Sequence, residues 1–411
     1  MSKEKLNIAL ITFEFPPYNA IGGIGSYFFN LANLLGNYGH KVFVFSCTNK
    51  EPTLAFIKNE NYENYLILAL SNNQFRKEVT KVFSDFLLEH KIDVIESPEV
   101  GACALDIKNK YPHIPLIVKM HTPGVLITKV YNSYHTFFKK IRYVLGSLRK
   151  GKLDLGFWAT SDKNMENDDE YIICKKADVL LSPSNALKKW AIKFWKFQEN
   201  KITVIANPFF LFSKHQTNAI KRDSKIICFV GKLTILKGIV VLTASIKKIV
   251  EQYPEYRFKI VGRDELISKE IPSAKSWMIN TLGESAKKVD FLGALNGDEV
   301  RNVFETSDIC LVPSLWENYP TVILEAIVAG CPVIASNRGG MPEIIEHKKT
   351  GLLFSATSSN DLTEKIKLII EHKNFGFELA KNAQVMVLNN IDVQKNILNV
   401  YEQFQKHNCN N

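Results

Sequence analysis

Residues 226–238 read Ile-Ile-Cys-Phe-Val-Gly-Lys-Leu-Thr-Ile-Leu-Lys-Gly. The apolar run Ile226–Val230 predicts a buried strand, and Gly231 marks the turn that ends it. The segment that follows, Ile239–Gln252, has the apolar spacing of an amphipathic helix. A strand, a glycine turn and a helix in this order form the repeating unit of a parallel α/β sheet, so this stretch predicts the fold class.

The same alternation continues through the second half of the chain. Because parallel neighbours need crossover connections, strands separated by helices predict a parallel sheet with both faces covered. The further strands are predicted at Arg257–Val261, Val289–Leu292, Ile309–Val312 and Val333–Ala335, and the further helices at Gly297–Glu305, Thr321–Ala329 and Asp361–Glu371.

The first half carries an independent series of the same kind. Strands are predicted at Leu6–Phe13, Lys41–Ser46, Val94–Glu96, Leu116–Met120, Val179–Leu181 and Ile202–Ile205, and helices at Tyr27–Tyr38, Gln74–Glu89 and Asn185–Phe197. The polar stretch 208–224 has no periodicity and is interpreted as a linker. We therefore expect two doubly wound, Rossmann-like domains, 1–207 and 225–390, that face each other across a cleft at the carboxyl ends of both sheets.

Composition narrows the class of protein. With 411 residues, 46% hydrophobic and 23% charged, the chain is globular rather than collagen-like or disordered. No apolar run reaches membrane-spanning length, so we expect neither a transmembrane helix nor a signal peptide, and a cytoplasmic location. Seven cysteines without a CxxC pair indicate reduced core residues rather than disulfides or zinc ligands.

Positive charge leaves three kinds of partner open. The 52 Lys and Arg residues exceed the 42 Asp and Glu residues by 10, which suits a nucleic acid, an anionic membrane or an anionic substrate. The segment 129–152 contains seven basic residues and no acidic one, with apolar residues at helical spacing. It is either an ordinary helix with a solvated basic face or a helix that lies on the inner face of the cell membrane.

Two glycine-rich turns could hold an anion. Gly22 and Gly23 lie between the first predicted strand and a helix predicted to begin by Ser26, where backbone N–H groups favour phosphate. Gly231 is followed by Lys232 and Lys237, whose charges would suit a diphosphate, although the pattern is not a P-loop. The alternatives are a turn without a ligand and two surface lysines.

Three further groups are candidates for contact with a substrate. Glu317 precedes a predicted helix and Glu325 lies about one turn inside it, where carboxylates could accept hydrogen bonds from sugar hydroxyls. The alternatives are a solvated loop acid for Glu317 and helix-dipole stabilisation for Glu325. A second glycine turn with an acid is found at 337–343. His121 follows a predicted strand, where a structural role is the alternative.

In this order along nearly the whole chain, these motifs resemble the retaining glycosyltransferases of family 4, which have the GT-B architecture. The pair Glu317 and Glu325, with seven residues between them, carries the resemblance most specifically, with His121-Thr122-Pro123 and the two glycine turns beside it. The chain departs from the common family pattern at Lys232, where arginine is usual, and at 318–320, where glycines are usual.

The resemblance implies a role for each candidate residue. Lys232 and Lys237, with Gly231, would hold the diphosphate of a nucleotide sugar, and Glu325 would bind the ribose. Glu317 and the backbone of Asn318, Tyr319, Pro320 and Thr321 would contact the transferred sugar, with His121 nearby. Gly22 and Gly23 would close over the phosphates, and a C-terminal helix within 391–411 would pack on the first domain.

The resulting hypothesis is a hexosyltransferase. It would move a hexose from a nucleoside diphosphate sugar to a hydroxyl acceptor with retention, in polysaccharide or glycolipid assembly. Because the chain has no DxD motif, we expect no metal and no other cofactor. The alternatives are a sugar-nucleotide 2-epimerase of the same fold and, from charge alone, a nucleic-acid-binding protein. Scattered basic residues and the lack of a recognised motif argue against nucleic acid.

Overall fold

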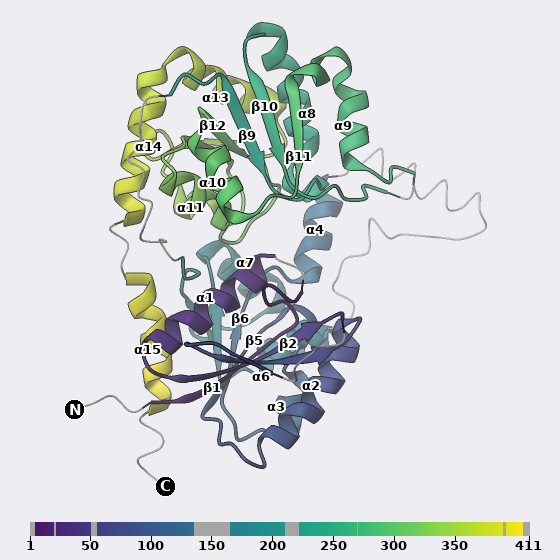
Figure 1. Ribbon diagram of the computed structural model, residues 1–411, viewed down its shortest axis with the longest axis vertical. Helices are drawn as coiled ribbons and strands as arrows, with labels where there is room; N and C mark the ends of the chain where they lie inside the picture. Colours follow the sequence, from purple (N-terminus) through teal and green to yellow (C-terminus); the bar gives the residue numbers. More distant parts are fainter. Residues whose placement is uncertain are drawn as a thin grey trace. The chain divides into compact units, whose positions relative to one another are not determined.

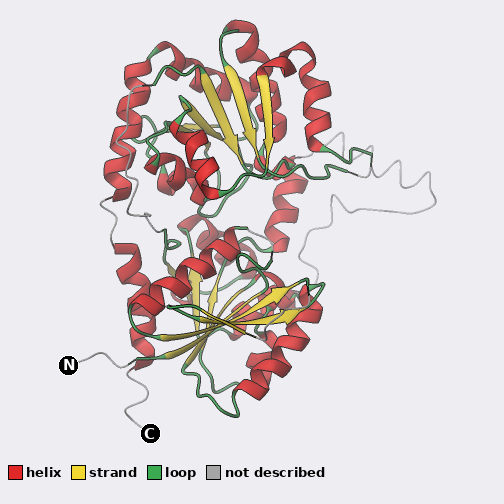
Figure 2. Ribbon diagram, viewed as in Figure 1, coloured by secondary structure: helices red, strands yellow, loops and turns green. Residues whose placement is uncertain are grey.

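The computed structural model describes residues 5–19, 22–50, 56–134, 165–209, 222–268, 270–388 and 392–405. The chain divides into two compact units (Figure 1). Unit 1 comprises Met1–Leu126, Thr160–Phe210 and Ile391–Asn411, and unit 2 comprises Ile127–Ala159 and Leu211–Asn390. Each contains one sheet with helices on both faces (Figure 2), which confirms the predicted α/β fold class.

Unit 2 is built on a six-stranded, wholly parallel sheet in the order β11-β10-β9-β12-β13-β14. Its strands are β9 Ile226–Val230, β10 Arg257–Val261, β11 Val289–Gly293, β12 Ile309–Val312, β13 Val333–Ser336 and β14 Leu352–Phe354. Its helices include α8 Ile239–Gln252, α9 Ala274–Leu282, α10 Gly297–Glu305, α11 Thr321–Val328, α12 Met341–Ile344, α13 Ser359–Glu371 and α14 Lys373–Leu388. The short helix η4, Ile235–Lys237, follows β9.

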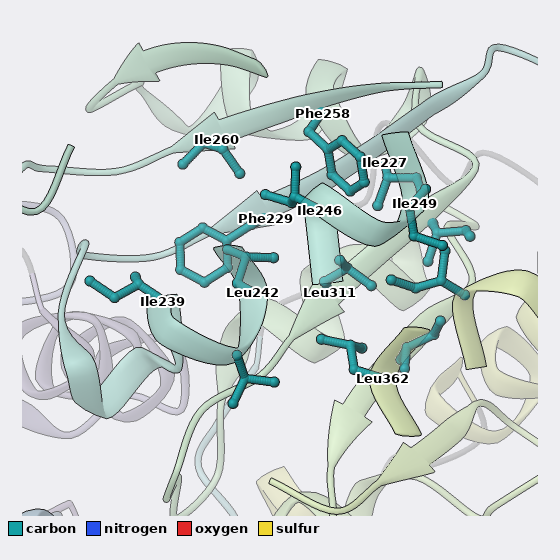
Figure 3. Packing of buried hydrophobic residues seen from close by; sticks show 14 of the residues in the cluster. Ile227, Phe229, Ile239, Leu242, Ile246, Ile249, Phe258, Ile260, Leu311 and Leu362 are labelled. Atoms are coloured by element: carbon teal, nitrogen blue, oxygen red, sulfur yellow. The ribbon is translucent and has the colours of Figure 1, made fainter. Parts of the chain in front are cut away.

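The core of unit 2 fixes the ends of its central strands. Phe229 of β9 and Leu311 of β12 pack against α8, whose Leu242 and Ile246 lie on one face, and all four are at most 2% exposed (Figure 3). Such burial stabilises by about 1.5–3 kcal/mol for each large apolar side chain. The loops that leave β9 and β12 therefore start from rigid positions.

Unit 1 is built on an eight-stranded sheet in the order β3-β4-β2-β1-β5-β6-β7-β8, parallel except for β3 with β4. The strands are β1 Asn7–Thr12, β2 Lys41–Thr48, β3 Phe56–Lys58, β4 Glu63–Leu68, β5 Val94–Pro98, β6 Leu116–Lys119, β7 Val179–Ser182 and β8 Ile202–Val204. The helices include α1 Gly23–Asn37, α2 Asn72–Phe86, α3 Leu105–Lys110, α4 Gly124–Tyr134, α6 Asp169–Lys176 and α7 Asn185–Trp195; the boundary of unit 2 falls within α4.

The C-terminal helix α15, Asp392–Gln405, is part of unit 1. Its residues Ile397, Leu398 and Val400 are at most 7% exposed and share one apolar cluster with residues of β1 and α1. Only one face of α15 is buried in this way, and polar residues on the opposite face are exposed to solvent.

Three findings concern the cysteines, membrane-spanning helices and metal ligands. The six cysteines within the described ranges are free and buried, as predicted, and Cys409 lies outside those ranges. In the part of the chain that the structure describes, no helix has both the length and the apolar character needed to cross a membrane. The same residues contain no group of three or more metal-ligating side chains that could hold an ion.

Candidate functional site

The strand order of unit 2 creates one topological switch point. Its first strand, β9, lies between β10 and β12, so the chain leaves β9 toward one side of the sheet and returns to β12 on the other. Loops that follow the two central strands diverge at such a point, and ligands of doubly wound sheets bind there, beside the carboxyl ends. In unit 2 these loops are 231–238 and 313–320.

Close backbone contacts hold the two loops together near the strand ends. The N–H of Leu315 donates to the carbonyl oxygen of Leu236 at 2.8 Å. Gly238 has φ of +78°, and a Cβ atom there would lie 1.9 Å from the carbonyl oxygen of Pro313. Glycine is therefore required at 238, both for the left-handed backbone and for the close approach. Thr234 caps η4 by accepting the N–H of Lys237.

One ion pair joins the two loops across the switch point. The Nζ of Lys237 donates to Oε1 of Glu317 at 2.5 Å. The side chain of Lys237 is 34% exposed and that of Glu317 is 18% exposed, so the pair is partly shielded and open to a ligand. Two of the residues predicted from the sequence are thus brought into direct contact.

A glycine turn from the next strand holds the backbone of Glu317. The N–H of Gly340 donates to the carbonyl oxygen of Glu317 at 2.7 Å. Gly339 has φ of +59°, and a Cβ atom there would lie 2.0 Å from that same oxygen. The glycine turn found in the sequence at 337–343 therefore packs on the acid directly, which the sequence did not indicate.

The residues after Glu317 differ in the hydrogen-bonding groups that they offer. The indole Nε1 of Trp316 donates to Oδ1 of Asn318 at 2.6 Å, and Asn318 is 6% exposed. Pro320 is the N-cap residue of α11 and has no N–H, so it cannot donate to a substrate. Backbone donation from this segment is therefore restricted to Asn318, Tyr319 and Thr321.

Glu325 lies one turn inside α11 and has an exposed side chain. Its carboxylate forms a hydrogen bond with Thr321, the first residue of the same helix. Lys232 is also exposed. Within the described ranges, neither Glu325 nor Lys232 forms a hydrogen bond or an ion pair with Lys237 or Glu317. Two hollows of unit 2 lie elsewhere, one beside Arg222 and Asp308 and the other at 368–375.

In unit 1, His121 follows β6 and is oriented by a buried carboxylate. The backbone N–H of His121 donates to both oxygens of Glu99 at 2.7 Å, and Glu99 is fully buried. Its ring Nδ1 lies 3.0 Å from the carbonyl oxygen of Lys119. Glu99 was not predicted from the sequence, although its place just past the end of β5, the strand beside β6, is a signal that could have identified it.

The glycine pair at the start of α1 differs from expectation. The helix begins at Gly23 rather than near Ser26 or Tyr27, and Gly22 is its N-cap residue with an extended backbone. Glycine lowers helix propensity, which hid the first turn from the apolar pattern. A Cβ atom on Gly22 would lie 2.6 Å from Oε2 of Glu14, so the carboxylate of Glu14 occupies the space beside this glycine.

The basic segment 129–152 is described only in part. Helix α4 covers Gly124–Tyr134, and the remaining residues of the segment lie outside the described ranges. At the start of α4, the N–H of Gly124 donates to Oε2 of Glu170 at 2.7 Å.

Burial, together with the charge of Glu99, raises the pKa of Glu170 to about 7. The unfolded chain releases this proton near pH 4.3, so between that pH and about 7 the folded state binds more protons and stability falls as the pH rises. Glu170→Gln keeps an acceptor for Gly124 but has no proton to lose. We therefore expect its free energy of unfolding, relative to that of the native protein, to increase by about 1–3 kcal/mol from pH 5 to pH 8. Urea unfolding at both pH values measures this gain; a difference in stability that is the same at both would contradict it.

Two families match successive parts of the chain. Residues 21–209 match Glycosyltransferase Family 4, and residues 212–386 match Glycosyl transferases group 1. An uncharacterized glycosyltransferase of Methanocaldococcus jannaschii is 24% identical over 412 residues, which cover 97% of this chain and 98% of that protein.

Two solved structures share the fold. Sucrose-phosphate synthase from Thermosynechococcus elongatus superposes with a TM-score of 0.74 at 18% identity, over 97% of this chain and 99% of that one. The Anabaena protein HepE, solved in complex with UDP-glucose, superposes with a TM-score of 0.68 at 16% identity, over 97% of this chain and 100% of that one.

Proposed function

Because this chain belongs to the family 4, group 1 glycosyltransferases of the GT-B fold, we propose that it transfers a hexose from a nucleoside diphosphate sugar to a hydroxyl acceptor, with retention of configuration. The Lys237–Glu317 pair at the switch point of unit 2 is the observation that carries this proposal. It joins a cation suited to a diphosphate with an anion suited to hydroxyl groups.

The pair can bind both parts of a donor at once. An ammonium group has three N–H donors, so Lys237 can keep its bond to Glu317 and donate to a phosphate oxygen. The second oxygen of Glu317 can accept from a hydroxyl of the hexose. Lys232, on the same loop, would add a second positive charge, and Glu325 would accept from the ribose hydroxyls.

In the proposed reaction the bond between the anomeric carbon and the diphosphate oxygen breaks. Both bonding electrons leave with the nucleoside diphosphate, whose growing charge Lys237 and nearby N–H groups stabilise. The acceptor hydroxyl attacks from the same face, and its proton passes to the departing phosphate oxygen. We propose that these lysines and N–H groups neutralise the diphosphate without a divalent cation.

Binding of the donor is the direct test. UDP, GDP, ADP, UDP-glucose, GDP-mannose and ADP-glucose would each be added at 1 mM, about 100 times a Kd of 10 µM, in a thermal-shift assay with and without EDTA. We expect one nucleotide series to stabilise the protein by about 2.7 kcal/mol at that ratio, equally in EDTA. Glu325→Gln should reduce the stabilisation by UDP-glucose and UDP alike, if uridine is the base.

Three outcomes would count against the proposal. Stabilisation by none of the nucleotides would remove the donor site. A thermal shift that disappears in EDTA and returns with Mg²⁺ would contradict the proposal of metal-free binding but not the donor site itself. Glu364→Gln, which changes an exposed carboxylate inside helix α13 of the same unit, is the matched control. An equal loss of binding in it would remove the specific role of Glu325.

Transfer is favoured over epimerisation because the full-length relative is named a glycosyltransferase. A 2-epimerase would change the sugar of the donor without any acceptor, which NMR analysis of the products distinguishes from transfer. For the acceptor we propose a polysaccharide or a glycolipid at the inner face of the cell membrane. The charge supports this choice, since residues 1–210 carry 27 Lys and Arg against 20 Asp and Glu, an excess of 7.

A further inference from the structure

A second fully buried carboxylate of unit 1, Glu96, lies on β5, next to the strand β6 that His121 follows. Glu96 of β5 is 0% exposed, and burial raises its pKa. A buried carboxylate is unfavourable unless donors surround it. Two tyrosines supply them: the hydroxyl of Tyr27 donates to Oε1 at 2.5 Å, and the hydroxyl of Tyr401 donates to Oε2.

The two tyrosines come from opposite ends of the chain. Tyr27 belongs to α1 and Tyr401 to the C-terminal helix α15, and they are 3% and 1% exposed. Each oxygen of Glu96 thus has its own phenol donor. Because both hydroxyl groups donate to the same carboxylate, a change in the position of Tyr401 also changes the position of Tyr27.

Tyr27 in turn packs on His121. Their ring centroids are 5.3 Å apart, with the planes nearly perpendicular. The ammonium of Lys119, which is fully buried, lies 5.2 Å from the centroid of the Tyr27 ring and donates to the carbonyl oxygen of Ile205 at 2.5 Å. The backbone carbonyl of Lys119 contacts Nδ1 of His121. Tyr27 is therefore held between Glu96, Lys119 and the histidine ring.

We propose that Tyr401 is a positioning residue for His121, acting through Glu96 and Tyr27, so that the C-terminal helix forms part of the reaction machinery. Its effect on turnover rests on the proposed function. Loss of the Tyr401 hydroxyl leaves one oxygen of Glu96 short of a donor in a dry site, and the carboxylate and Tyr27 then readjust. The histidine ring loses its fixed edge contact as a consequence.

Two readouts test the proposal in the full-length protein. In Tyr401→Phe we expect the ring ¹H signals of His121 to shift, because the ring of Tyr27 moves relative to them. These signals are assigned from a His121→Asn sample. With UDP-glucose, GDP-mannose and ADP-glucose as probes, we expect kcat for the accepted donor to fall about tenfold at unchanged KM. Ile397→Val, which loosens the same helix without touching Glu96, is the control and should leave both readouts unchanged.

Glu96→Gln is the second variant in case Tyr401→Phe does not fold. The amide keeps the shape of the site but replaces one acceptor by a donor, so the His121 signals should shift here too. Unchanged His121 signals in the folded variant, or an equal change in Ile397→Val, would overturn the proposal. The NMR readout needs no turnover: if the native protein turned over no sugar nucleotide while the signals shifted, the proposed function would fall and the positioning of His121 would stand.

Discussion

Lys237→Ala is expected to lose about 10²- to 10³-fold in kcat/KM, the effect of removing one preorganised donor aimed at a leaving group. The ammonium lies beside Glu317 at the switch point of unit 2, where the diphosphate would depart. Steady-state kinetics with the donor identified by thermal shift measures the loss. Folding should change little, because a partly exposed ion pair contributes at most about 1 kcal/mol.

Lys365→Ala is the matched control for this variant. Lys365 is 24% exposed and pairs with Asp361 on α13, so it resembles Lys237 in burial and pairing but lies on a different element. Lys237→Arg should recover part of the rate because it keeps the charge. An unchanged kcat/KM in Lys237→Ala, or an equal loss in Lys365→Ala, would remove Lys237 from the reaction.

The partner of the same pair should behave differently. Glu317→Ala frees the charge of Lys237, so affinity for the free nucleoside diphosphate should stay the same or rise. Turnover should fall, because the proposed contact of Glu317 with the sugar is lost. Calorimetric titration with the nucleotide separates the two effects. If Glu317→Ala and Glu325→Gln weakened nucleotide binding equally, the proposed division of roles between the two acids would be wrong.

Gly339→Ala is expected to destabilise the protein by about 2–4 kcal/mol and to reduce turnover. An alanine in left-handed backbone costs about 1–2 kcal/mol. The remainder comes from the clash with the carbonyl oxygen of Glu317, 2.0 Å from the new Cβ, which also breaks the hydrogen bond from Gly340. The displaced Glu317 backbone takes its carboxylate away from Lys237. Urea unfolding and steady-state kinetics measure the two effects.

Gly293→Ala is the control that adds backbone strain without a steric clash. Gly293 has φ of +72°, and a Cβ atom there meets nothing within 4 Å. It should therefore show the backbone cost alone, with kinetics like those of the native protein. Equal destabilisation in the two variants, with normal turnover in Gly339→Ala, would show that the glycine turn does not hold Glu317.

Secondary structure was predictable where apolar runs end sharply. Strands β9, β10 and β12 and helix α8 have the predicted bounds, because each is a continuous or strictly periodic apolar segment next to glycine or polar residues. The short strand β3, half-exposed or exposed throughout, and β4, only partly buried, were missed, since their partners rather than their own pattern hold them in the sheet.

The candidate site was predictable only residue by residue. A glycine and a lysine after a strand, or two acids near a helix start, are local patterns with chemical meaning, and they identified Lys237 and Glu317 from the sequence. That these two residues touch is a contact across 80 positions of the chain. It follows from the order of β9 and β12 in the sheet, which local pattern does not specify.

The sequence by itself determined two α/β units, because strand and helix periods and glycine turns are properties of neighbouring residues, and the glycosyltransferase family followed from the resemblance of its motifs. Only the tertiary structure decided what surrounds the functional groups. Glu99 under the backbone of His121, Gly339 on the carbonyl of Glu317 and Tyr401 on Glu96 are contacts between distant segments. A buried polar atom must find its partner wherever the packed chain places one, and no local period encodes that place.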